Sequence, residues 1–106
     1  MFEDLYDAIS MYWSARWPSI EAEVTAVDVE RIERRRGETL RLAVAYKFSI
    51  GEDGPYTGVT FWEPSNGSER VPAAKNQFEL GQAVLVRYRR DDPSVNTLDR
   101  SVWADL

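Results

Sequence analysis

The sequence predicts a mostly β fold of the α+β class, with an N-terminal amphipathic helix on a bent antiparallel sheet. We expect five or six strands that close toward a small barrel or sandwich. Two observations predict this fold. Residues 39–50 place a large apolar side chain at each of six consecutive even-numbered positions, which is typical of a half-buried antiparallel strand. Turns containing glycine or proline separate this stretch from further alternating stretches on both sides.

The length of 106 residues favours one domain with a single core. Because the apolar period changes near Pro18, we divide the domain 1–106 into a helix over residues 1–17 and a β-rich body over residues 18–106.

Residues 2–16 predict an amphipathic helix. Five large apolar residues fall on one stripe at helical spacing: Phe2, Leu5, Tyr6, Ile9 and Trp13. Pro18 ends the helix, because the residue before a proline is pushed away from helical dihedral angles. We interpret the segment as a helix docked on the sheet. A membrane-surface or partner-binding helix is the alternative, although its acidic polar face is unlike that of membrane-surface helices.

Residues 20–34 predict one long, bent strand. The apolar phase slips near Ala26–Val27 and again near Glu30–Arg31. Each slip predicts a β-bulge, because a one-residue shift turns the later side chains to the opposite face. The turn over residues 34–37 then carries three arginines and Gly37. We interpret these arginines as a solvated hairpin tip, with a phosphate or acidic-partner contact as the alternative.

The next hairpin joins the strand over residues 39–50 to a strand over residues 56–62. The even-numbered residues of the first strand are the apolar ones, and residues 51–54 form the turn. Val59 and Phe61 lie on one face of the second strand.

The rest of the chain predicts a short helix and the closing strands. Ser68 is expected to cap a helical piece over residues 69–77, and Phe78 and Leu80 to anchor its exit on the core. Residues 83–89 predict the closing strand, and the tail containing Leu98 and Trp103 adds a last strand. In the closing strand we expect these residues to face inward: Val84, Val86 and Tyr88.

Two segments carry a family resemblance. The first is a strand, a turn and a Y-x-G segment: Tyr46-Lys47-Phe48-Ser49-Ile50, Gly54, Tyr56 and Gly58. The second is a closing strand with a G-x-x-V-x-V-x-Y pattern and a proline turn: Gly81 to Tyr88, Pro93 and Leu98. Together they resemble a bacterial family known as domain of unknown function 3592, over roughly residues 20–98. The resemblance implies a small β-rich domain of unknown biochemical role and provides no catalytic residue.

The amino-acid composition limits the kinds of catalytic and metal site that the chain can form. The sequence contains no cysteine and no histidine, so a Ser-His-Asp triad and a Cys- or His-ligated metal site are excluded within the chain. The formal charge of −5 argues against nucleic acid and anionic membranes. No apolar run approaches the length of a membrane span, and no signal peptide is recognisable. We therefore expect a soluble cytoplasmic protein without a cofactor or metal.

The favoured function is a non-enzymatic domain that binds a protein partner or self-associates. Four tryptophans and five tyrosines exceed what a core of this size needs, and such residues are enriched at interface hot spots. Trp62, Trp103 and Tyr12 are the candidate partner-binding residues, because their positions do not clearly point inward. The alternative interpretation is that they cover an open end of the core.

Two other functions stay open. A small barrel could bind a small ligand, or single-stranded nucleic acid through cations of shared outward parity: Arg41, Lys47, Arg87 and Arg89. We consider cross-strand ion pairing the simpler account of these cations. An enzyme would depend on carboxylates alone, such as Asp91–Asp92 or Glu52–Asp53. Adjacent turn carboxylates usually point apart, so this is the least favoured function.

Overall fold

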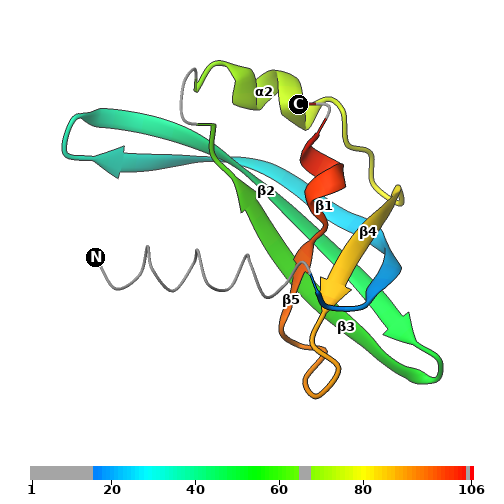
Figure 1. Ribbon diagram of the computed structural model, residues 1–106. Helices are drawn as coiled ribbons and strands as arrows, with labels where there is room; N and C mark the ends of the chain where they lie inside the picture. Colours follow the sequence, from blue (N-terminus) through cyan, green and yellow to red (C-terminus); the bar gives the residue numbers. More distant parts are fainter. Residues whose placement is uncertain (1–15, 65–67, 105) are drawn as a thin grey trace.

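The computed structural model describes residues 16–64, 68–104 and 106. Its elements are β1 (Ser19–Arg34), β2 (Gly37–Ile50), β3 (Asp53–Trp62), α2 (Arg70–Lys75), β4 (Ala83–Tyr88), β5 (Asn96–Leu98) and the 3₁₀ helix η1 (Arg100–Trp103). The strands form one antiparallel sheet in the order β3-β2-β1-β4-β5, with little helix (Figure 1). The mostly β class and the last strand are confirmed. The predicted N-terminal helix falls mainly on residues 1–15, which lie outside the described residues.

The β1–β2 hairpin is long and contains one bulge. The register shifts between Val24 and Ala26, where Val24 pairs with Tyr46 and Ala26 with Ala45. The first predicted interruption is therefore real, but it lies one or two residues earlier. The second, near Glu30–Arg31, is wrong, because the pairing continues without a shift to the tip. Ile32 stays on the face opposite the core, so no second slip is needed to turn it inward.

The core lies on one face of this bent sheet. Along β2 the even-numbered residues are buried from Leu42 to Phe48, as the alternation predicts. Val84 and Val86 of β4 are also buried, and half-buried Tyr88 packs against the core, which confirms the inward face of the closing strand. The buried apolar residues are Ala22, Val24, Leu42, Val44, Tyr46, Phe48, Val71, Ala74, Val84, Val86 and Leu98. We call the opposite face of β1, β2 and β3 the outer face.

The two edge strands approach each other without closing a barrel. The amide of Leu98 in β5 donates to Oγ1 of Thr60 in β3 over 3.1 Å, and Nδ2 of Asn96 donates to the carbonyl of Thr57 over 3.2 Å. Within the described residues, however, no backbone ladder joins β3 to β5. The predicted closure toward a barrel is therefore wrong. β5 has three residues, too few to cover the ten-residue edge of β3.

The short helix α2 covers one end of the core. It begins one residue later than predicted, with Glu69 at the N-cap position and no side-chain cap. Ser68 instead accepts a hydrogen bond from the amide of Val71 through its carbonyl oxygen. Phe78 packs against the core as expected. The prediction for Leu80 is wrong, because this side chain is 72% exposed beyond the helix exit.

Candidate partner-binding surface

The structure brings Trp62 and Trp103 together although 40 residues separate them in the sequence. Their rings stack with centroids 6.3 Å apart and an interplanar angle of 13°. Phe78 meets Trp103 edge-on at 5.9 Å, and the guanidinium of Arg70 lies 5.7 Å from the centre of the Trp62 ring. Both tryptophans are half-buried and pack against the core. The cluster therefore has a packing role, and each tryptophan keeps some surface that a partner could contact. Tyr12, the third candidate, lies outside the described residues.

A second group of apolar side chains is far more exposed. Val59 and Phe61 of β3 are 52% and 46% exposed. The sequence places the two residues on one face, and the structure shows that this is the outer face. The register decides this, because Val59 pairs with Ala45 and Phe61 with Ala43. Paired residues of neighbouring strands project from the same face.

Small residues form the floor beside these two side chains. Ala26 of β1 pairs with Ala45 across the ladder, so alanines of two strands adjoin Val59. We define the outer apolar patch by its five residues: Ala26, Ala43, Ala45, Val59 and Phe61. Alanines on a sheet face leave a shallow surface that a partner can approach closely, with Val59 and Phe61 standing above it. The sequence held one signal of this patch: the two alanines interrupt the polar row of β2.

Arg41 fixes the aromatic ring of the patch. Its guanidinium carbon lies 3.9 Å from the centre of the Phe61 ring. Both Nε and Nη2 of Arg41 lie 2.8 Å from Oε2 of Glu30, the residue directly opposite on β1. This cation–π contact and the ion pair together restrict the rotamers of Phe61 and Arg41. The patch is therefore ordered before any partner arrives, which lowers the entropy lost on binding.

The four cations proposed as a nucleic-acid surface are each paired with a carboxylate. Two of the pairs are cross-strand, Arg41 with Glu30 and Lys47 with Glu23, as ion pairing predicts. The other two pairs are Arg87 with Asp99 at 2.7 Å and Arg89 with Asp91 at 2.5 Å. Because these four cations are already paired with carboxylates, they attract the phosphates of a nucleic acid only weakly.

The pKa values of two carboxyl groups, those of Asp99 and Asp91, are lowered, and this direction does not indicate acid–base catalysis. Hydrogen bonds from Ser101, and then from Arg87, lower the pKa of Asp99 to about 2, and a hydrogen bond from Arg89 lowers that of Asp91. A general acid at neutral pH needs the opposite shift. In the described part of the chain, no cluster of three or more acidic, histidine or cysteine side chains has the arrangement of a metal site.

The fold and this surface define a small β-rich domain that presents an open sheet face. The chain belongs to the family described as Domain of unknown function (DUF3592), whose model matches residues 20–103, so the resemblance drawn from the two strand motifs is confirmed. The comparisons with curated proteins and with solved structures found no match. None of the helices that the structure describes has the length and apolarity needed to cross a membrane.

Proposed function

We propose that this domain is a non-enzymatic protein-binding module whose main contact surface is the outer apolar patch. One observation carries the proposal. Phe61 is 46% exposed, and it is held in place by Arg41 rather than left free. Aromatic residues and arginine are enriched at protein interfaces, where a few residues contribute most of the binding energy.

The surroundings of the patch support a protein partner over a small molecule. The patch is a sheet face rather than an enclosed cavity, and small-molecule sites are usually concave. Charged residues adjoin it, namely Asp28 opposite Ala43, and Glu30 with Arg41. An apolar centre with a charged border is the ordinary composition of a protein–protein contact.

The aromatic residues named from the sequence belong to the same proposal in a secondary role. Trp62 and Trp103 keep exposed area, and we expect them to contribute where a partner extends toward α2. Tyr12 would contribute from the amphipathic helix that we expect over residues 1–17.

The experiment compares Phe61→Ser with Leu80→Ser. Leu80 is 72% exposed and lies outside the patch, so it controls for the loss of one large apolar side chain. A photo-crosslinking amino acid at position 59 or 80, in cells of the source organism, identifies proteins that contact each place. We then measure the affinity of the purified partner by calorimetry.

We expect a specific crosslink from position 59 and none from position 80. Phe61→Ser should weaken the affinity about tenfold or more, the scale of a hot-spot residue. Leu80→Ser should change it less than about twofold, and neither variant should shift the melting temperature much, because exposed positions contribute little to folding. A partner that binds Phe61→Ser as tightly as the wild type would contradict the proposal.

A further inference from the structure

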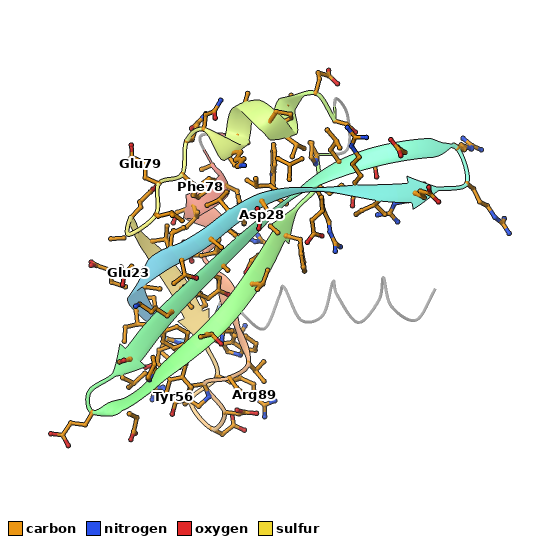
Figure 2. All side chains as sticks on the ribbon, turned by 180° about the vertical axis from the view of Figure 1, so that it is seen from behind. Glu23, Asp28, Tyr56, Phe78, Glu79 and Arg89 are labelled. Carbon is orange, nitrogen blue, oxygen red and sulfur yellow. The ribbon has the colours of Figure 1, made fainter. Side chains whose placement is uncertain are left out.

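The sheet contains a fork between β1 and β2. Residues 19–23 of β1 pair with β4, and residues 23–34 pair with β2. The pairing with β2 stops at Glu23 and Lys47, and from there the end of the β2–β3 hairpin diverges from the start of β1 (Figure 1). A cleft of about 530 Å³ lies in the fork. Its lining includes Glu21, Ala22 and Glu23 of β1 and Lys47, Phe48 and Ser49 of β2. Figure 2 labels Glu23 at the fork.

The main chain of β1 presents unpaired groups to this cleft. The carbonyl of Pro18 accepts from the amide of Tyr88 over 3.1 Å, and the amide of Val24 donates to the carbonyl of Gln82 over 2.9 Å. Before the bulge, the even-numbered residues at the start of β1 therefore direct their amides and carbonyls toward β4. Because alternate residues of a strand direct these groups to opposite sides, those of Glu21 are directed toward the fork.

The main chain of β2 also presents unpaired groups to the cleft, from the opposite side. Lys47 is its last residue paired with β1, and Phe48 pairs with Tyr56 of β3. The next residue on the β1 side is Ser49, whose amide and carbonyl are directed into the fork. Glu21 and Ser49 have no ladder partner there within the described residues. The cleft is therefore bordered by two strand edges that face each other.

Apart from Lys47 and Ser49, the side chains that border the cleft are acidic or apolar. Glu21 is exposed and has no ion-pair partner among the residues that the structure describes. The carboxylate of Glu23 lies 3.5 Å from Nζ of Lys47, which leaves one of the two acids uncompensated. Ala22 and Phe48 are buried at 4% and form an apolar floor.

We infer that this cleft binds an extended peptide segment of alternating small apolar and basic residues, which adds to the sheet as a further strand. An extended main chain supplies the repeating donors and acceptors that Glu21 and Ser49 lack. Its alternate side chains would meet the apolar floor and the carboxylates in turn. The volume lies within the range of binding pockets, and the chain's net charge of −5 favours a basic ligand. The cleft shares no residue with the outer apolar patch, so this inference does not depend on the function proposed above.

The test uses the full chain and synthetic heptapeptides that alternate lysine and valine. One control peptide carries glutamate for lysine, and a second is methylated on alternate main-chain nitrogens. Calorimetry measures affinity, and amide hydrogen exchange followed by NMR measures protection at Glu21 and Ser49. Glu21→Lys reverses the free charge, and Glu52→Lys makes the same change at an exposed turn outside the cleft.

We expect the lysine peptide to bind and to protect the amides of Glu21 and Ser49, and the methylated peptide to bind about tenfold more weakly or worse. Glu21→Lys should weaken binding about tenfold, and Glu52→Lys and Phe61→Ser less than about twofold. The inference would be overturned if the lysine peptide did not bind at a concentration on the order of 1 mM, or if the methylated peptide bound equally well. It would also be overturned if the wild-type protein were a dimer that Glu21→Lys dissociates, because a second copy of the chain would then fill the cleft.

Discussion

The hydroxyl of Tyr46 donates a 2.7 Å hydrogen bond to Oδ1 of Asn96. Tyr46 belongs to β2 and Asn96 to β5, two strands that are not neighbours in the sheet. The same hydroxyl lies 3.1 Å from Oγ1 of Thr60 on β3. Burial raises the pKa of Tyr46 to about 12, so the hydroxyl keeps its proton at neutral pH. These side chains join the two sheet edges where a barrel would have a backbone ladder.

Removing the Tyr46 hydroxyl should destabilise the fold. Tyr46→Phe leaves the half-buried Oδ1 of Asn96 without this donor, and we expect the free energy of unfolding to fall by about 0.5–1.5 kcal/mol. Urea denaturation measures the change. Tyr56→Phe is the matched control, because Tyr56 is half-buried and contacts Phe48 through its ring. An equal effect of the two substitutions would show that the hydrogen bonds of the Tyr46 hydroxyl do not stabilise the contact between the two sheet edges.

Gly58 should tolerate no side chain. A Cβ atom at this position would lie 2.0 Å from Oδ1 of Asn96 and 2.7 Å from the Tyr46 ring. We expect Gly58→Ala to lower the free energy of unfolding by about 1–3 kcal/mol through overpacking. Gly51→Asn is the control, because Gly51 has an open surrounding and a φ of +60°, which asparagine adopts readily. Similar denaturation midpoints for the two variants would contradict the close packing described here.

Asp99 should make stability depend on pH in the acid range. Its carboxylate accepts from Oγ of Ser101 over 2.6 Å and from Nε of Arg87 over 2.7 Å, and its pKa is lowered from 3.8 to about 2. The folded state therefore favours the charged form. The resulting stability is fully present above pH 3.8 and is lost as the pH falls toward about 2.

Asp99→Asn tests this linkage. We expect the variant to be less stable than the wild type near neutral pH, and the difference to shrink as the pH approaches about 2. Denaturation curves at several pH values measure it, with Asp53→Asn at the exposed start of β3 as the control. A difference that stays constant with pH would assign the effect to packing rather than to charge.

The stacked tryptophans should be energetically coupled. A double-mutant cycle with Trp62→Leu and Trp103→Leu should give a coupling energy of about 0.5–1.5 kcal/mol, the range for aromatic pairs. Trp103 and Tyr56 serve as the control pair and should be additive, because Tyr56 contacts Phe48 instead. If the tryptophan variants keep wild-type stability but no longer bind a partner protein, these residues act in binding rather than in packing.

The sequence could predict the strands where one periodicity dominated. The even-numbered row of β2 is buried as its alternation indicates, and the closing strand follows the same rule. The bulge in β1 could be predicted from the slip in apolar phase, although its position was one or two residues off. The sequence could not exclude the second bulge, because Ile32 looks like a core residue when its ladder partner is unknown.

The candidate surface could be predicted only in part. The pattern shows that Val59 and Phe61 share a face, and hydrophobicity alone would favour burying it. The pairing of Val44 with Thr60 and of Tyr46 with Gly58 instead turns the other face of β3 inward. The Tyr46 hydroxyl lies within hydrogen-bond distance of Thr60, and the Tyr46 ring leaves no room for a side chain at Gly58. Thr60 and Gly58 therefore occupy the core side of β3, although they are less apolar than Val59 and Phe61.

The sequence by itself determined the family, the mostly β class and the two inward rows of β2 and β4, because these depend on local periodicity and short motifs. The tertiary structure decided which face of β3 is exposed, that Trp62 meets Trp103, and where β1 parts from β2. These features depend on register between strands distant in the sequence. Register is fixed by pairwise packing and hydrogen bonds such as that of Tyr46 with Asn96, and neither partner reveals such a bond alone.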